Sequence, residues 1–335
     1  MIRLFFYAPL LLLTCTCAAA APPEANLVEV KKIWDEAPHS AFTDLAYWKN
    51  QFVCVFREGR GHVSADGRIR VLTSPDGAEW SSAAVVELEG FDLRDAGLSV
   101  LPDGKLMLVG GAAPRKTDNE SAPTATFVAF SQDAATWTRP KIVVPPGRWM
   151  WRVAWSPAKP HKAYGVSYAA PDGRPFSSLL TSSDGVDFQP HVARLYGEGY
   201  PTEAALRFDS AGMLYCLQRR DGDAPENSAL LGISAPPYIE WQWHDLKIYF
   251  GGPNFIQLPS GVWIAAGRIL REDGPKTELA VLNMEEKSLE PIQQLPSGGD
   301  TSYPGLVWHD DTLWVSYYSS HEDKTSIYLA KVRLH

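Results

Sequence analysis

Short apolar runs separated by polar turns recur along most of the chain. Residues 98–101 and 105–109 are one example, since they are mainly apolar and flank the polar pair Asp103-Gly104. Two strand-like segments joined by a tight turn predict a β-hairpin. Comparable turns lie roughly 50 to 57 residues apart, at Lys49-Asn50, Asp103-Gly104, Pro160-His161, Ala211-Gly212, Ser260-Gly261 and Asp310-Asp311. The pattern therefore predicts six hairpins at a nearly constant spacing.

A second repeat has the same spacing. It reads SPDGAEW at 74–80, SQDAATW at 131–137 and SSDGVDF at 182–188, in steps of 57 and 51 residues, with weaker copies at 234–241 and near Asn283. In such a loop Asp accepts backbone N–H bonds, Gly permits a positive φ, and the aromatic ring packs between neighbouring units. Two further strands surround each loop, as at 69–72 and 84–86. Four strands in each of six units predict an all-β fold, a six-bladed β-propeller of four-stranded antiparallel blades.

The two ends of the chain are predicted to share one blade. Residues 326–332 read as the third strand of the last blade, and residues 27–33 read as a strand before the first hairpin. We expect this N-terminal strand to supply the missing outer strand of the last blade. Because no Gly/Ser-rich linker interrupts the pattern, residues 22–335 are predicted to form a single domain.

Residues 1–21 have the pattern of a secretory signal peptide. Arg3 precedes an apolar run at 4–13, and alanines at 18–21 offer a cleavage site. The run is too short to span a bilayer as a mature helix, and no other long apolar run predicts a membrane-spanning segment. The sequence LLTC at 12–15 loosely resembles a bacterial lipobox, which leaves a lipid anchor on Cys15 open. We expect the mature protein to be secreted or periplasmic, or anchored at the cell surface.

Composition narrows the range of partners. The chain of 335 residues has 12 Trp, 26 Gly and 26 Pro, which is typical of an all-β fold with many turns. A formal net charge of −8 argues against nucleic acid as a partner. Cys54 and Cys216 lie in apolar strand-like runs and are expected to be buried free thiols. We expect a monomer. Neither a cofactor nor a metal is predicted, because no metal-ligand spacing or phosphate-binding Gly loop is found.

The innermost strands of a propeller line its central axis, and side chains from all blades converge at their entry ends. Arginines, carboxylates and aromatic rings dominate these positions. They include Thr43, Asp44, Arg57, Glu58, Arg60, Arg94, Asp95, Trp149, Trp151, Arg152, Glu203, Arg219, Arg220, Asn254, Arg268, Tyr303, Tyr317 and Tyr318. Since arginine pairs with carboxylates and aromatic rings stack on sugar faces, this set suits an anionic, ring-shaped ligand.

The repeats and the six blades together resemble the sialidase superfamily over essentially the whole mature chain. Glu203, nine residues before Gly212, and Arg219, at the end of the same hairpin, are similar in arrangement to the catalytic glutamate and one triad arginine of sialidases. Residues 303–306 (YPGL) resemble the Tyr-Ser-Asp-Leu segment that holds the nucleophilic tyrosine. Residues 56–60 (FREGR), followed by Asp66, resemble the stretch with an arginine and the acid/base aspartate.

The resemblance implies a secreted sialidase-like exo-glycosidase that removes terminal, acidic sugars from glycans with retention. Tyr303 would be the nucleophile, activated by Glu203, because a neutral phenol is not repelled by a carboxylate on the anomeric carbon. Asp66 or His62 would be the acid/base. Substrate-binding candidates are Arg57, Arg60, Trp151, Arg152, Arg219, Asn254 and Arg268, of which Arg219 and Arg268 are expected to hold an anionic group.

One stretch departs from the sialidase pattern. The first blade of sialidases begins with an Arg-Ile-Pro segment that grips the substrate carboxylate, whereas residues 41–45 read AFTDL here, without an arginine. Two other functions therefore stay open: a glycosidase or lyase acting on another acidic sugar, such as a uronic acid, and a non-catalytic glycan-binding propeller. A purely structural role is also open for the candidates, such as an ion pair between Glu203 and Arg219 or packing of Tyr303 at a blade end.

Overall fold

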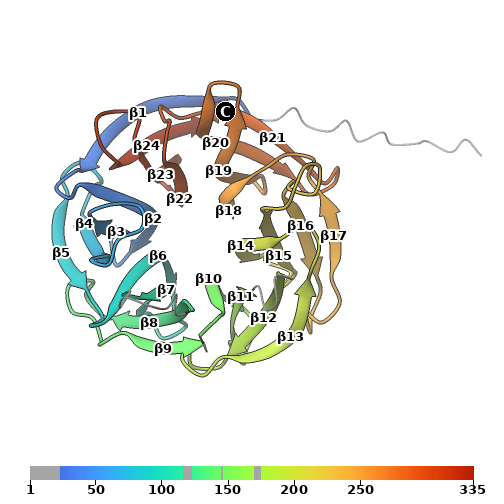
Figure 1. The fold of residues 1–335 in the computed structure, drawn as a ribbon. Helices are drawn as coiled ribbons and strands as arrows, with labels where there is room; N and C mark the ends of the chain where they lie inside the picture. Colours follow the sequence, from blue (N-terminus) through green and yellow to red (C-terminus); the bar gives the residue numbers. More distant parts are fainter. Residues whose placement is uncertain (1–22, 116–122, 145, 170–174) are drawn as a thin grey trace, which may run out of the picture.

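The protein is a ring of six four-stranded antiparallel sheets around a central axis (Figure 1), which confirms the predicted six-bladed propeller. The computed structural model describes residues 23–115, 123–144, 146–169 and 175–335. The proposed signal peptide lies outside these residues. All regular elements within the described ranges are strands, and none of the described segments is a helix able to cross a membrane.

The strands of each blade run from the axis to the rim. Those nearest the axis are β2 (His39–Trp48), β6 (Phe91–Val100), β10 (Trp149–Trp155), β14 (Pro201–Phe208), β18 (Gly251–Gln257) and β22 (Thr301–His309). The second strands are β3 (Gln51–Gly59), β7 (Leu106–Pro114), β11 (Ala163–Ala169), β15 (Leu214–Arg220), β19 (Trp263–Arg271) and β23 (Thr312–Ser319). The third are β4 (Arg68–Ser74), β8 (Ala125–Ser131), β12 (Phe176–Ser182), β16 (Leu230–Ser234), β20 (Gly274–Asn283) and β24 (Ser326–Leu334). The outer strands are β5 (Ser81–Val86), β9 (Lys141–Val144), β13 (Gln189–Tyr196), β17 (Gln242–Asp245), β21 (Ser288–Gln294) and β1 (Ala25–Trp34).

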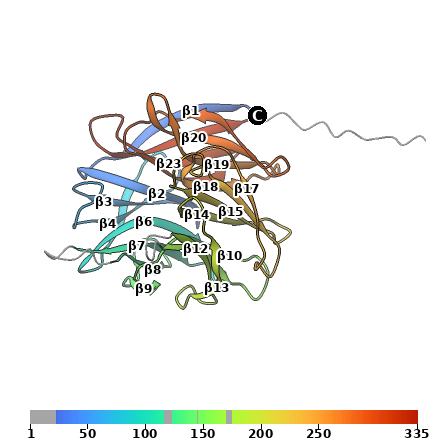
Figure 2. The ribbon, with the colours of Figure 1, turned by 45° about the vertical axis from the view of Figure 1, so that its right-hand side comes forward.

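The last blade contains both ends of the described chain. Strand β1 pairs antiparallel with β24, with Leu27 opposite Val332 and Lys31 opposite Leu329. Glu24 and His335 exchange two backbone hydrogen bonds of 3.0 Å beyond these strands. Figure 1 shows β1 on the outer side of β24 and β23, and Figure 2 shows β1 at the edge of the molecule, beyond β23. The N-terminal strand therefore closes the ring, as the sequence predicts.

Apolar side chains fill the spaces between neighbouring blades. Between the first two blades, for example, Val53 and Val55 of β3 pack in one buried cluster with Leu106 and Leu108 of β7. Cys54 and Cys216 are buried free thiols, as expected from their apolar sequence context. Burial raises the pKa of both thiols, so neither is poised to react as a thiolate.

Every innermost strand contains a β-bulge where its register with the second strand shifts. A bulge bends the strand and re-aims a side chain. The bulged pairs are Phe42-Thr43, Asp95-Ala96, Trp151-Arg152, Thr202-Glu203, Gly252-Pro253 and Tyr303-Pro304. Phe42, Asp95 and Tyr303 adopt positive φ angles of 63°, 50° and 49°. The bulges thus direct side chains from different blades toward the same part of the axis.

The Ser/Asp/aromatic loops lie at the opposite end of the blades from the bulges, because Ser74 pairs with Phe52 next to the hairpin turn. In the third blade, Asp184 Oδ1 accepts the backbone N–H groups of Val186 and Asp187 at 2.8 and 2.9 Å, and Ser182 Oγ accepts that of Gly185 at 3.0 Å. The loops at Asp76 and Asp133 make equivalent bonds. Their role in the fold is to satisfy backbone donors in a tight turn.

Replacing Asp184 by Ala should lower the free energy of unfolding by about 1–3 kcal/mol, since two backbone donors lose their acceptor. Chemical denaturation of both proteins measures the change. Asp187→Ala in the same loop is the matched control, because the Asp187 backbone, not its side chain, makes the loop bond. Equal destabilisation by both substitutions would contradict the assigned role.

Candidate active site

Tyr303, Glu203 and Arg219 meet at the axis. Tyr303 lies in the bulge of β22, and Glu203 in the bulge of β14. The Tyr303 hydroxyl donates to Glu203 Oε1 at 2.5 Å, and Arg219 Nη1 donates to Glu203 Oε2 at 2.5 Å and to the Tyr303 oxygen at 3.3 Å. Three residues selected from the sequence are therefore in direct contact, although 100 positions separate Tyr303 from Glu203.

The environment keeps the Tyr303 phenol protonated. Burial and then the negative charge of Glu203 raise its pKa well above the usual value, while Arg219 opposes this shift. A neutral phenol is a weak nucleophile unless a base takes its proton. Glu203 Oε1 is the acceptor of that proton in the observed hydrogen bond.

Aromatic rings enclose Tyr303. Trp151 stacks on it with ring centroids 4.8 Å apart, Tyr318 lies at 5.8 Å, and Phe42 contacts it edge-on at 5.2 Å. Arg268 lies over the Tyr303 ring and donates Nη2 to the Tyr318 hydroxyl at 3.1 Å. Trp151 and Arg268 thus join the site, whereas the resemblance alone did not single out Phe42 or Tyr318.

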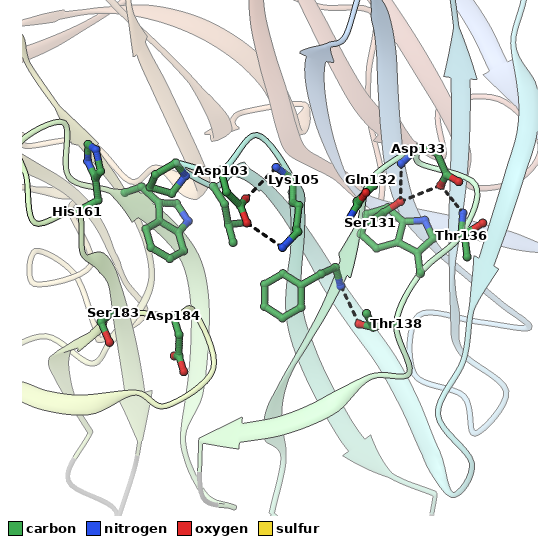
Figure 3. A pocket seen from close by; sticks show the side chains of 15 residues that line it. Asp103, Lys105, Ser131, Gln132, Asp133, Thr136, Thr138, His161, Ser183 and Asp184 are labelled. Carbon is green, nitrogen blue, oxygen red and sulfur yellow. Dashed lines mark hydrogen bonds and ion pairs between the residues drawn. The ribbon is translucent and has the colours of Figure 1, made fainter.

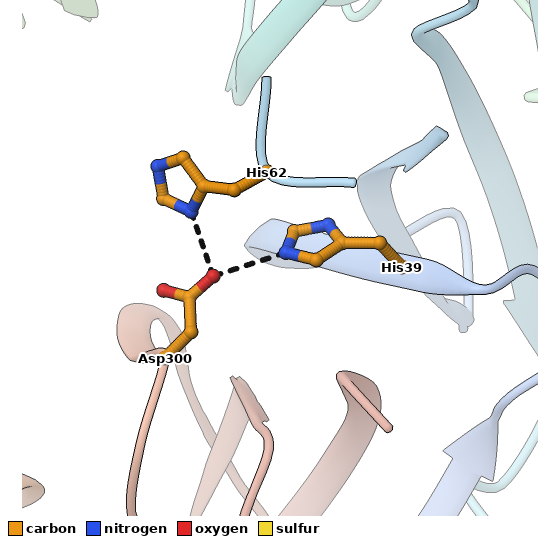
Figure 4. A group of neighbouring side chains, drawn as sticks. All are labelled: His39, His62 and Asp300. Carbon is orange, nitrogen blue, oxygen red and sulfur yellow. Dashed lines mark hydrogen bonds and ion pairs between the residues drawn. The ribbon is translucent and has the colours of Figure 1, made fainter. Parts of the chain in front are cut away.

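A carboxylate flanked by two histidines forms the first-blade side of the site (Figure 4). Asp300 Oδ2 lies 2.7 Å from His62 Nδ1 and 3.0 Å from His39 Nε2. Burial works against the Asp300 charge, but the bonds from His39 and His62 outweigh it, so the pKa of Asp300 lies well below its usual range. The His62 ring contacts Phe42 edge-on with centroids 5.0 Å apart, which joins this group to the Tyr303 side of the site.

The three donor atoms of this group lie within 4.8 Å of one another, close enough to surround a metal ion. The sequence did not indicate the group, because its members stand at 39, 62 and 300. The hydrogen bonds to Asp300 account for the convergence, and we assign no metal to it.

Asp95 is a further ionisable group at the axis. Burial raises the pKa of Asp95 to about 7, and the negative charge of Glu203 adds to this shift. Coulombic interactions with Arg94, His62 and Arg57 oppose it. The charge of Asp95 also acts on Tyr303 and Tyr168, which places all three in one electrostatic environment. Its position at a blade mouth was visible in the sequence, but its partial burial was not.

The side chains of Asp66 and Arg60 make no hydrogen bond to Tyr303, Glu203 or Arg219 in the described structure. Their side chains pair with each other at 3.3 Å in an exposed part of the loop after β3. Although slight burial opposes it, hydrogen bonds from Ser64 and Arg60 lower the pKa of Asp66 to about 2. A carboxyl group with so low a pKa holds no proton near neutral pH and is poorly suited to be a general acid.

Arg57 binds the loop after β3, which contains both His62 and Asp66. Its side chain is fully buried, donates Nε to Asp92 Oδ1 at 2.8 Å and donates Nη1 to the Gly61 carbonyl at 2.8 Å. Arg57 therefore links the first blade to the second and positions the segment that carries His62. These bonds place it beneath the loop rather than at the axis.

Arg152 and Asn254 bind the backbone next to the nucleophile candidate, Tyr303. Arg152 pairs with Asp44 at 2.6 Å and donates to the Pro304 carbonyl at 3.2 Å, and Asn254 donates to the same carbonyl at 2.9 Å. Both side chains are buried. Their contacts hold the backbone just after Tyr303, so their observed role is positioning.

A separate cavity of about 1110 Å³ lies on the other face of the ring, between the second and third blades (Figure 3). Its walls come from the hairpin turns and Ser/Asp/aromatic loops of these blades, including Trp137, Trp155, Asp133 and Asp184. None of the axial residues described above lines it.

Comparisons with known proteins identify the fold. No protein-family model matches the chain, and no curated protein matches it in sequence. A protein of unknown function from Dyadobacter fermentans matches in structure with a TM-score of 0.79 at 16% identity, over 93% of this chain and 100% of that one. A Trypanosoma rangeli sialidase in complex with the inhibitor DANA matches with a TM-score of 0.70 at 15% identity, over 93% of this chain and 60% of that one.

The Hadza microbial sialidase Hz136 also matches, with a TM-score of 0.63 at 12% identity, over 89% of this chain and 66% of that one. The match to the T. rangeli sialidase covers only 60% of the length of that protein. At these identities the likeness establishes a sialidase-like six-bladed propeller fold.

Asp95→Asn tests the half-buried carboxyl group of Asp95. A folded-state pKa of about 7 lies above the unfolded value near 3.9, so stability from protonated Asp95 is present below pH 4 and is lost as pH rises through 7. The shift corresponds to about 4 kcal/mol at most, since one pKa unit is about 1.4 kcal/mol. The variant should therefore gain stability relative to wild type between pH 4 and pH 8 in urea denaturation. A pH-independent difference would contradict the raised pKa.

Proposed function

We propose that the protein is an exo-acting glycoside hydrolase that retains configuration and uses Tyr303 as its nucleophile. The observation that carries the proposal is the contact of the Tyr303 hydroxyl with Glu203 at 2.5 Å, with Arg219 bound to both groups. A nucleophile, its base and a group that orients the base are the requirements of covalent catalysis. The site lies at the axis of a closed ring, which suits a chain end better than the middle of a polymer.

In the first step the Tyr303 oxygen forms a bond to the anomeric carbon while the bond to the leaving oxygen breaks. The phenol proton passes to Glu203 Oε1 along the existing hydrogen bond. Arg219 holds the other carboxylate oxygen, so Oε1 stays directed at the phenol. The leaving oxygen needs a proton from a general acid at the same time.

His62 is the acid in this proposal. Its Nδ1 lies 2.7 Å from Asp300 Oδ2, and this contact orients the ring. Nε2, on the other side of the ring, is left to donate to the leaving oxygen. In the second step neutral His62 takes a proton from water, the water oxygen attacks the anomeric carbon, and Glu203 returns its proton to the departing Tyr303 oxygen. Atoms, protons and charges balance over the two steps.

The proposal includes export from the cytoplasm, for which the N-terminal sequence is the support. Cell fractionation and mass determination of the mature N-terminus would test it. Processing after residue 21 indicates release by signal peptidase, whereas a lipid on Cys15 indicates an anchored protein.

Tyr303→Phe should lower kcat at least 10³-fold while leaving glycan binding within a few-fold of wild type, because only the nucleophilic oxygen is lost. Initial rates on a panel of fluorogenic glycosides measure the change. Tyr317→Phe is the matched control, since that buried tyrosine donates to the Pro296 carbonyl and makes no contact with Glu203. Full turnover by Tyr303→Phe would refute the proposed mechanism, and glycan binding without turnover by wild type would instead favour a non-catalytic propeller.

His62→Gln and Asp66→Asn distinguish the two acid/base candidates. The first substitution should reduce kcat/KM by roughly 10²–10⁴-fold on substrates with poor leaving groups, and much less on activated aryl glycosides. The second should change kcat/KM less than threefold on both. The opposite pattern would transfer the acid/base role to Asp66.

A further inference from the structure

Three aromatic rings line the cavity between the second and third blades. Phe130 and Trp137 belong to the second blade and Trp155 to the third, and all three side chains are half-buried. Their inner faces pack against the cores between blades. Among the described residues, none of the three contacts another aromatic ring. Their remaining surface is therefore apolar and is not covered by a neighbouring ring.

Other junctions on this face of the propeller are filled by aromatic contacts beside the hairpin turns. Tyr47 of the first blade stacks on His309 of the sixth with ring centroids 3.8 Å apart. Tyr215 of the fourth blade contacts Trp263 of the fifth at 5.1 Å. The junction of the second and third blades instead forms a cavity of about 1110 Å³. Sites for small organic ligands have roughly 300–1,000 Å³, so this cavity has room for a ligand of more than one ring.

The two indole rings of the cavity are held in place by their own loops. Trp137 donates Nε1 to the Ala134 carbonyl at 2.8 Å, so this ring offers its apolar surface to a ligand. The backbone at Gly185 packs directly on Trp155, since a Cβ there would lie 3.1 Å from the indole. A surface that is already ordered loses little conformational freedom when a ligand binds.

Hydrogen-bond acceptors lie beside the aromatic rings (Figure 3). Asp133 and Asp184 each use Oδ1 for the backbone of their loop, while Oδ2 has no partner in the described parts of the chain. The backbone N–H bonds lower the pKa of both carboxyl groups, so both are ionised at neutral pH. His161 Nδ1 lies 2.8 Å from the Ser156 carbonyl, which only accepts, so Nε2 of the neutral ring is a further acceptor.

The charges around the cavity are of both signs. Its ionisable lining side chains are Asp103, Lys105, Asp133, His161 and Asp184. Lys105 Nζ pairs with Asp103 at 2.8 Å, and Lys49 Nζ donates to the Gln132 carbonyl at 2.7 Å. An uncharged group that both donates and accepts hydrogen bonds suits such a mixed lining, and a hydroxyl does both.

A purely apolar ligand would not satisfy this lining. Such a ligand, or a proline-rich peptide, covers aromatic rings but brings few or no N–H or O–H donors to Asp133 and Asp184. Covering an ionised carboxylate without a hydrogen bond is unfavourable. A sugar ring has apolar C–H groups on its faces and hydroxyl groups along its edges, so it contacts both the indoles and the carboxylates.

We propose that this cavity is a second carbohydrate-binding site, which takes a glycan segment of two or more sugar rings on Trp137 and Trp155. Trp155 follows Trp151 by four positions on β10, which is roughly 13 Å at about 3.3 Å per residue. The sugar held here is therefore not the one beside Tyr303. The site keeps the protein on a glycan while the axis stays accessible to a chain end. It does not depend on the proposed function, since a non-catalytic propeller would bind glycan there equally.

The test applies the labelled mature chain to an array of neutral and acidic oligosaccharides and measures the affinity of those that bind by calorimetry. At least one should bind wild type, and Trp137→Ala should weaken its binding roughly tenfold or more, because a stacking surface is lost. Trp80→Ala is the matched control. Trp80 occupies the same place in the first-blade loop and donates Nε1 to the Gly77 carbonyl, but it does not line the cavity.

Ser183→Trp is a second variant that fills the cavity without removing a buried contact, since Ser183 is exposed on its wall. It should also weaken binding roughly tenfold or more. Both variants should hydrolyse a fluorogenic monosaccharide glycoside at the wild-type rate; if wild type has no such activity, the binding series decides alone. The inference is overturned if no oligosaccharide binds, if neither variant weakens binding, if Trp80→Ala weakens it equally, or if only a proline-rich peptide binds.

Discussion

The backbone hydrogen bonds between β1 and β24 are the constraint on which the rest of the molecule depends. Each blade packs only against its two neighbours, so an open ring would leave two apolar blade faces in water. Pairing Leu27 with Val332 and Lys31 with Leu329 joins the two ends of the described chain in one sheet. Asp300, next to β22 in the last blade, lies 3.0 Å from His39 and 2.7 Å from His62 of the first blade, and these contacts across the point of closure require the same closed ring.

Within the closed ring, the bulges convert a symmetric scaffold into an asymmetric site. All six innermost strands interrupt their register, but the residues presented differ in chemistry: an apolar ring at Phe42, a carboxyl group at Asp95, an indole at Trp151, a carboxylate at Glu203 and a phenol at Tyr303. Gly252 in the fifth blade presents no side chain, and a Cβ there would come within 3.0 Å of the Tyr303 ring. The bulge in the backbone sets the direction of each side chain, and the residue type at the bulge sets its chemistry.

The sequence predicted the fold because hairpin turns and Ser/Asp/aromatic loops report the same spacing through independent physical effects. It also selected Tyr303, Glu203 and Arg219, since each stands at a definable place in its hairpin. It did not distinguish Arg57, Arg152 and Asn254, which lie beneath the site, from Arg268, which faces it. Polar residues at a blade mouth look alike in sequence, and only burial and partners separate them. Asp300 and His39 were missed because their roles depend on contacts across 261 positions.

The two halves of the candidate machinery are built on different kinds of backbone. Tyr303 and Glu203 stand on paired strands, whereas His62 stands on a loop that Arg57 holds from below through the Gly61 carbonyl. A change of loop sequence can therefore alter the proposed proton donor without disturbing the proposed nucleophile. In evolutionary terms, the proposed acid is exchangeable, while the proposed nucleophile is fixed by the architecture of the ring.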